Sequence, residues 1–285
     1  MIPDLAIVGS GPAGAQAAKA AIEAGASVVM LDYGIDDPDA RASVPDAPFS
    51  ELRRTDPDQA RYFWGAVEAR RLHEGRRVAG HLTAPRDFAV AEALERQPVR
   101  STTFTPVQSL ALGGLGAAWG AGAPCFEAHE LEAIGLSAIA LDDAYDEVIR
   151  DIGVSAAWDD ATAPYVLRSR ATQPPAELDS NARTLLDAYA RRREALERKG
   201  FVLGRPALAL LTEPIRRAGC DRDANPYYDM DFYGDARRSI YRPRYTIEEL
   251  RAEPRFSYLG GVLVQSFADD DEGVRLHFVA RDGTT

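Results

Sequence analysis

The residues that most clearly indicate a binding function form the segment Gly9-Ser10-Gly11-Pro12-Ala13-Gly14. A glycine at its first position permits a tight turn, one at the second lets a phosphate approach the backbone, and one at the third lets a helix pack closely on a strand. Free N–H groups at the start of the following helix attract phosphate, and Pro12 suits a first helical turn, where its missing N–H is not needed. The spacing therefore predicts binding of a dinucleotide pyrophosphate.

The elements needed to position this motif lie on both sides of it. Residues 5–8 and 27–31 are apolar and predict two buried strands, and residues 12–24 predict an alanine-rich helix that ends at Gly25. This order indicates a βαβ unit with parallel strands. Asp32 ends the second strand, roughly 20 residues beyond the motif, where an acid can bind both ribose hydroxyls and disfavours a 2′-phosphate. We expect FAD or NAD rather than NADP; the alternatives are an ordinary glycine-rich turn and a solvated surface role for Asp32.

A second glycine cluster lies within LALGGLGAAWGAGAP, residues 110–124. Helix and strand preferences do not explain it, because glycine in a regular element loses more backbone entropy than other residues. A flat ring such as a flavin lying against the backbone would explain the cluster, since backbone N–H groups stabilise its reduced, anionic form. The alternative is a close-packed loop crossing.

Three segments carry a resemblance to a known family: GSGPAG, LGGLGAAWGAGAP, and YRPRYTIEEL followed by a strand. Together they resemble the glucose–methanol–choline (GMC) flavoprotein oxidoreductases, among them pyranose oxidase and its bacterial relatives. The resemblance implies FAD and oxidation of an alcohol or sugar CH–OH group by hydride transfer to flavin N5. It implies that the strand at 261–264 meets the adenine end of FAD through the backbone of Val262 or Val264. The residues that it places along the flavin are Gly113, Gly114, Gly116, Ala117, Ala118 and Trp119.

Two departures from that family matter. Ala118 stands where pyranose oxidase has the histidine that attaches FAD covalently, so we expect non-covalent FAD. The family's catalytic base is a histidine near the C-terminus, in a half that this sequence lacks, so the catalytic residues are unknown. We expect that the sequence is a fragment or that a second polypeptide supplies the C-terminal half. The alternatives are another FAD-dependent reductase or monooxygenase, or a flavin-binding subunit without catalysis that completes a partner chain.

The predicted fold class is α/β, a Rossmann-like FAD-binding domain with part of a mixed or antiparallel substrate domain. Residues 1–155 form the FAD-binding domain, with a covering excursion at about 33–106. Residues 156–244 form part of the substrate domain, and residues 245–285 return to the FAD-binding domain without completing it. Further helices are predicted at 58–71, at 141–152, at 180–199 with Ser180 as cap, and at 246–250 with Thr246 as cap. Strand-like residues lie at 201–211, and residues 259–267 and 274–280 predict a hairpin.

Other residues carry weaker signals. His129 follows the second glycine cluster and Cys125 lies near it, but a surface group and a small buried hydrophobe are the simpler interpretations. An aromatic group could line a carbohydrate or apolar pocket or form the core of the smaller domain. Its members are Tyr227, Tyr228, Phe232, Tyr233 and Tyr241.

Composition narrows the function classes. The 285 residues carry a formal net charge of −11, which argues against nucleic acid and anionic membranes as partners. Two distant cysteines and four scattered histidines give no metal or dithiol spacing. No apolar run is long enough to cross a bilayer, and no basic segment precedes the first strand, so we expect a cytoplasmic protein.

Overall fold

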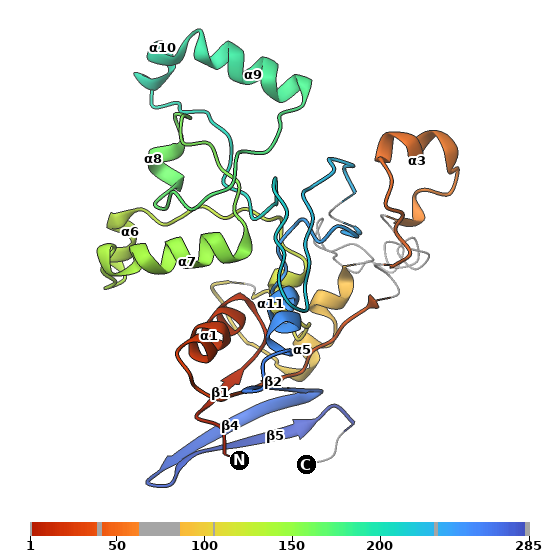
Figure 1. Cartoon of the computed structure of the whole chain (residues 1–285), viewed down its shortest axis with the longest axis vertical. Helices are drawn as coiled ribbons and strands as arrows, with labels where there is room; N and C mark the ends of the chain where they lie inside the picture. The colour runs from red at the N-terminus through yellow and green to blue at the C-terminus, as the bar shows by residue number, and fades with distance from the viewer. Residues whose placement is uncertain (1, 39–41, 63–85, 105, 231–232, 283–285) are drawn as a thin grey trace.

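The computed structural model describes residues 2–38, 42–62, 86–104, 106–230 and 233–282 (Figure 1). Its sheet has three parallel strands in the order β1-β2-β3. The register aligns Leu5 with Val28, and Val28 with Phe256. The strands are β1 (Leu5–Val8), β2 (Val28–Asp32) and β3 (Phe256–Gly260). The chain is an α/β protein, as its sequence predicts.

Helix α1 (Pro12–Glu23) connects β1 to β2 and confirms the predicted βαβ unit. Its alanine-rich face allows a close approach to the sheet, with Ala15, Ala18 and Ile22 buried. Gly25 follows the helix with a φ of +96°, in the left-handed region that favours glycine at a helix end. Helix α11 (Pro243–Leu250) packs against α1, and its Ile247 and Leu250 enter the same core.

The hairpin near the end of the sequence begins later than predicted. Leu259 belongs to β3, which pairs with β2, and Gly261 then changes the chain direction with a φ of +77°. The hairpin consists of β4 (Val262–Asp270) and β5 (Gly273–Ala280), which pair antiparallel. The prediction of one strand over 259–267 was therefore wrong, because a left-handed glycine separates two strands that pair with different partners.

The segments between β2 and α11 are helical and irregular in their described parts. Residue Leu208 forms antiparallel bridges with Gly122 and Ser155, and Leu210 bridges Ile240, so the strand-like run at 201–211 makes only isolated bridges there. The predicted helix at 58–71 lies mostly outside the described residues. The helices are α3 (Phe49–Thr55), η1 (Asp87–Val90), α5 (Ala93–Arg96), η2 (Gly114–Ala117), α6 (Ala128–Ala133), η3 (Ile139–Leu141), α7 (Asp142–Ile152), α8 (Ala163–Val166), α9 (Ser180–Ala190) and α10 (Arg193–Glu197).

Two predicted helices differ from those observed. The helix expected over 180–199 is divided into α9 and α10, and its cap is Asp179, whose Oδ1 accepts a hydrogen bond of 2.7 Å from the N–H of Ala182. The helix expected at 246–250 begins at Pro243, a residue that suits a first turn. Thr246 is therefore not a cap; it is buried inside α11, and its hydroxyl lies 2.9 Å from that of Tyr241.

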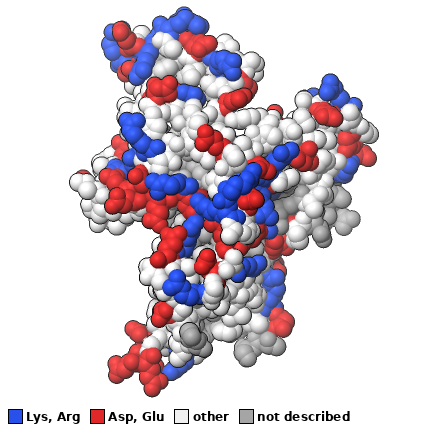
Figure 2. Space-filling model, viewed as in Figure 1, with Lys and Arg blue, Asp and Glu red and all other residues white. Residues whose placement is uncertain are grey.

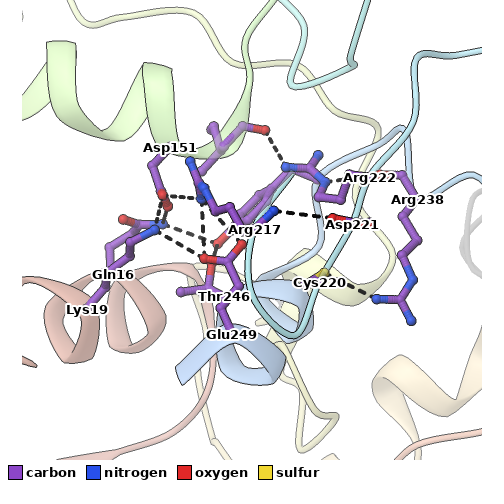
Figure 3. A network of polar contacts seen from close by, with 12 residues as sticks. Gln16, Lys19, Asp151, Arg217, Cys220, Asp221, Arg222, Arg238, Thr246 and Glu249 are labelled. Atoms are coloured by element: carbon purple, nitrogen blue, oxygen red, sulfur yellow. Dashed lines mark hydrogen bonds and ion pairs between the residues drawn. The ribbon is translucent and has the colours of Figure 1, made fainter. Parts of the chain in front are cut away.

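A group of polar and charged side chains joins α1, α7 and α11 (Figure 3). We call it the polar clamp; its members are Gln16, Lys19, Asp151, Arg217 and Glu249. Asp151 near the end of α7 accepts hydrogen bonds from Gln16 at 2.9 Å, from Lys19, and from Arg217 at 2.5 Å. Lys19 and Arg217 also contact Glu249 of α11 at 3.2 and 3.3 Å. Burial acts to raise the pKa of Asp151, but the hydrogen bonds and charges of the clamp lower it overall.

Acidic residues cover the turn of the β4–β5 hairpin, at the lower left of Figure 2, in the sequence Asp269 to Glu272. Within the described parts of the chain, no helix has the length and apolar character needed to cross a membrane.

Candidate functional site

The first glycine segment forms the turn between β1 and α1. Gly9 has a φ of +91°, and its N–H donates to the carbonyl of Leu31 at 2.8 Å, which ties the turn to β2. A Cβ on Gly14 would lie 2.0 Å from the carbonyl oxygen of Gly9, so no side chain fits there. A Cβ on Gly11, the N-cap residue of α1, would meet nothing within 4 Å. The turn thus leaves open space at the helix N-terminus, where phosphate binds most readily.

Ser10 joins the two glycine segments through one buried oxygen, an arrangement that we call the Ser10 junction. Its side chain donates to Oδ2 of Asp32 at 2.5 Å, and the same oxygen accepts the N–H of Gly113 at 2.8 Å. Ser10 is only 1% exposed. Residues more than 100 positions apart in the sequence are therefore held together at the carboxyl ends of β1 and β2.

Asp32 lies at the carboxyl end of β2, as the sequence predicts, but it is buried. Its Oδ1 accepts from the Ser10 N–H at 3.3 Å, and its Oδ2 accepts from the Tyr258 hydroxyl at 2.8 Å. Burial raises the pKa of Asp32, although the hydrogen bonds from Ser10 and Tyr258 oppose that shift. Burial and the carboxylate of Asp32 also raise the pKa of Tyr258. Sequence reasoning missed Tyr258, because its place depends on β3 pairing with β2.

The glycines of the second segment lie against the first. Gly113 and Gly114 have φ values of +95° and +57°, and a Cβ on Gly114 would lie 3.1 Å from the Cα of Gly11. A Cβ on Gly116 would lie 2.7 Å from Cγ of Pro243. Close packing therefore accounts for Gly114 and Gly116, as the loop-crossing alternative expects. The same packing places the segment beside the opening at the start of α1.

The residues after these glycines are buried and oriented by long-range contacts. Ala117 and Ala118 are buried, and Ala118 packs against Ala89. The Trp119 Nε1 donates to the carbonyl of Tyr241 at 2.6 Å, and the two rings meet edge to face at 6.4 Å. Arginine side chains hold the backbone: Arg86 donates to the carbonyl of Trp119 at 3.1 Å, and Arg242 donates to that of Ala117. Sequence reasoning did not identify either arginine.

A cavity of about 510 Å³ opens beside this segment. Among the residues that the structure describes, Ala117, Leu112 and Tyr245 form part of its wall, together with four arginines and three aspartates. The charged residues are Arg86, Arg238, Arg242, Arg244, Asp36, Asp46 and Asp235. A cavity of this size, with charged groups set in a largely apolar wall, accommodates a small organic ligand or one portion of a larger cofactor.

The other predicted residues lie elsewhere. Val262 and Val264 lie on β4, where they pair with Ala280 and Phe278 of β5. His129 is 75% exposed on α6, with its Nδ1 3.3 Å from Glu127, and Cys125 is buried in a core with Ile149 and Tyr241. No group of side chains suited to a metal ion occurs in the described ranges.

The aromatic group is divided by the fold. Tyr241 belongs to the core that contains Cys125, whereas Tyr228 and Tyr233 pack against a separate cluster around Leu52 and Met230. Tyr227 is 41% exposed, and Phe232 lies outside the described residues. Tyr233 alone of this group is among the described residues that line the cavity.

Several solved structures are similar to this chain, two of them oxidases. No protein-family profile and no curated protein sequence matches the chain. Pyridoxine 4-oxidase from Mesorbium loti has a TM-score of 0.44 and 15% identity, over 98% of this chain and 46% of that one. A formate oxidase from Aspergillus oryzae RIB40, in a structure that concerns modification of its FAD, has a TM-score of 0.42 and 13% identity, over 99% and 43%. The chain spans less than half the length of both.

Proposed function

We propose that the chain is the FAD-binding part of an oxidoreductase. The observation that carries this proposal is the Ser10 junction, which joins a phosphate-binding type of turn, a strand-end acid and a second glycine segment at one edge of a parallel sheet. Ligands of open α/β sheets bind at the carboxyl ends of the strands. The open space at Gly11 is where a pyrophosphate would lie. The residues present therefore fit a dinucleotide.

Each part of the site would hold a different portion of FAD. The N–H groups at the start of α1 would bind the pyrophosphate, and the Oδ1 oxygen of Asp32, which Ser10 engages only at 3.3 Å, would accept a ribose hydroxyl. The segment from Gly113 to Trp119 would lie along the flavin. Val262 and Val264 would meet the adenine end through their backbone. Nothing in the side chain of Ala118 can attach to FAD, so the binding would be non-covalent.

The reaction that we propose is oxidation of a CH–OH group in a small alcohol or carbohydrate. FAD supplies the redox chemistry by accepting a hydride. The chain would bind and orient the cofactor through the start of α1 and the segment around Ala117. The catalytic base would come from a second polypeptide or from the remainder of a longer protein.

An absorbance spectrum of the purified chain, followed by acid precipitation, tests for FAD. Flavin bands, with FAD released into the supernatant, are expected. Gly11→Ala should weaken FAD binding by about tenfold or more, because its Cβ fills the open space without disturbing the fold. Gly122→Ala is the matched control, since a Cβ there also meets nothing within 4 Å. Equal affinities for FAD in the two variants would contradict the proposed pyrophosphate position.

A second candidate function is a flavin-binding subunit that completes a partner chain. The edge of the sheet supports it: Leu5 and Val8 of β1 are 44% and 56% exposed. Parallel sheets are otherwise covered on both faces. Turnover by the isolated chain with FAD and an alcohol or sugar would contradict this candidate, whereas turnover that needs a second polypeptide would support it.

A further inference from the structure

The side chain of Tyr258 occupies a space in the sheet that two glycines leave open. Tyr258 lies on β3 opposite Met30 of β2, and two residues later Gly260 lies opposite Asp32. A Cβ on Gly260 would lie 2.8 Å from Cε1 of the Tyr258 ring, and a Cβ on Gly34 would collide with the Tyr258 hydroxyl. The ring therefore extends to the carboxyl end of β2 only because both neighbours lack a side chain.

Two further contacts fix this ring. It packs against the core beneath α1 and α11, which includes Met30 and Ile247. The guanidinium carbon of Arg251 lies 4.6 Å from the centre of the Tyr258 ring. Because the fold already orders the ring, its hydroxyl is held in one place with little further loss of conformational entropy.

The donors around Asp32 are divided unequally between its two oxygens. Oδ2 accepts from the hydroxyls of Ser10 and Tyr258 at 2.5 and 2.8 Å. Oδ1 accepts from the N–H of Ser10 at 3.3 Å, and the N–H of Tyr33 also stabilises the carboxylate. Each oxygen of a carboxylate has two acceptor positions, so two short bonds fill Oδ2. Oδ1, whose bond is longer, is therefore the oxygen at which a further donor adds most.

Both hydroxyls are fixed as donors to Asp32. The Ser10 oxygen accepts the N–H of Gly113, so its hydrogen is directed to the carboxylate. Burial and the negative charge of Asp32 raise the pKa of Tyr258, so its hydroxyl keeps its hydrogen. Oδ2 therefore stays engaged, and the plane of the carboxylate is set by the protein.

We propose that Tyr258 is a positioning residue for a nucleoside ribose: by holding Oδ2 of Asp32, it presents Oδ1 to one ribose hydroxyl. Asp32 lies where ligands of open α/β sheets bind, and it keeps 7% of its surface exposed. Without the Tyr258 donor the carboxylate turns more freely about its last bond, and Oδ1 loses its fixed place. That the nucleoside is the adenosine of FAD rests on the proposed function.

Affinities of the purified chain, freed of any flavin, for ADP, 2′-deoxy-ADP and 3′-deoxy-ADP test the proposal by titration calorimetry. The wild type should bind ADP roughly tenfold more tightly than at least one deoxy form, which lacks the hydrogen bond to the carboxylate. In Tyr258→Phe, which removes a single oxygen atom, this preference should fall to about threefold or less, while the affinity for that deoxy form stays unchanged. Tyr165→Phe, at an exposed position of α8, is the matched control and should keep the full preference.

A merely structural role of Tyr258 predicts a different result. Tyr258→Phe would then weaken binding of ADP and of both deoxy forms by the same factor, which would overturn the proposal. A preference unchanged from the wild type would overturn it too, as would a wild type that binds ADP no more tightly than both deoxy forms. Gly260→Ala is a second variant in case Tyr258→Phe does not fold: its Cβ displaces the ring but keeps the hydroxyl, so the preference should again fall.

Binding of FAD by the same chain separates this inference from the proposed function. A chain that binds FAD, with a ribose preference that does not depend on Tyr258, refutes the positioning role alone. A preference that depends on Tyr258 in a chain that does not bind FAD refutes the proposed function alone.

Discussion

Ser10 occupies a position of the glycine motif where the sequence pattern accepts any residue, and yet its hydroxyl serves two partners. The oxygen is a donor to Asp32 and an acceptor for Gly113. A hydroxyl can do both because it has one hydrogen and two lone pairs. The side chain at this variable position therefore links the two segments that we propose to hold FAD.

Ser10→Ala should destabilise the chain by about 2 to 4 kcal/mol, because the Gly113 N–H loses its acceptor in a buried place and Asp32 loses a donor. Urea unfolding followed by circular dichroism measures this change. The matched control is Ser266→Ala, at an exposed position of β4, which should stay within about 0.5 kcal/mol of the wild type. Equal stabilities of the two variants would contradict the role assigned to the junction.

The buried acid makes the stability depend on pH. Burial raises the pKa of Asp32 above its unfolded value of 3.8, so its contribution to stability is fully present below that pH and is lost as the pH rises through the folded pKa. Relative to the wild type, Asp32→Asn should therefore gain stability as the pH rises from about 4 to 7. Urea unfolding across that range measures the difference, with Asp143→Asn as a surface control. A difference that does not change with pH would refute the assignment.

At the scale of helices and strands, the sequence predicts what is local. The βαβ unit follows from short apolar runs around Gly9–Gly14, and α7 was predicted one residue too long at its start. The third strand of the sheet was missed as a separate element, because its pairing with β2 is set by contacts across more than 200 residues. Arg86 and Arg242 were missed for the same reason. Arg86 has no local motif, Arg242 lies in YRPRYTIEEL without a local sign of its partner, and only the fold brings them to one cavity.

The polar clamp makes the stability of the helix packing depend on pH, in the sense opposite to that expected for Asp32. Because the pKa of Asp151 is lowered, its contribution to stability is present above the unfolded value of 3.8 and is lost as the pH falls through the folded pKa. Asp151→Asn should lower the free energy of unfolding by roughly 2–3 kcal/mol at pH 7. The loss is smaller than for a fully buried ion pair, because Lys19 and Arg217 are partly exposed and still contact Glu249.

Chemical unfolding at pH 7 and pH 3 measures this effect. The difference between Asp151→Asn and the wild type should shrink at the lower pH. Asp146→Asn on the same helix is the control. A deficit as large at pH 3 as at pH 7 would show that the clamp does not depend on the charge of Asp151.

On the scale of the whole molecule, the described elements differ in how much of their surface other parts of the chain bury. Strand β2 is the central strand of its sheet and is buried along almost its entire length. The hairpin of β4 and β5 extends beyond the sheet (Figure 1), and its Phe267 and Val274 are 73% and 62% exposed. Two-stranded hairpins have little stability of their own.

Hydrogen exchange should reveal this contrast. Amides of β2 should exchange only with global unfolding, whereas those of the outer hairpin from Ser266 to Asp270 should exchange orders of magnitude faster. Mass spectrometry at several protein concentrations measures both segments. Equal protection of the two at low concentration would contradict this expectation, and protection of the hairpin that grows with concentration would indicate self-association.

The pairing of β3 with β2 has a consequence for biosynthesis. The sheet cannot receive its third strand until the ribosome has made Phe256–Gly260, although β1 and β2 leave it more than 200 residues earlier. At about 5–20 residues per second, β2 must wait on the order of ten seconds or more with one edge unpaired. Closing so long a loop is also slow. Nascent chains stalled before Phe256 should therefore be captured by chaperones, and those stalled well after Gly260 should be released from them.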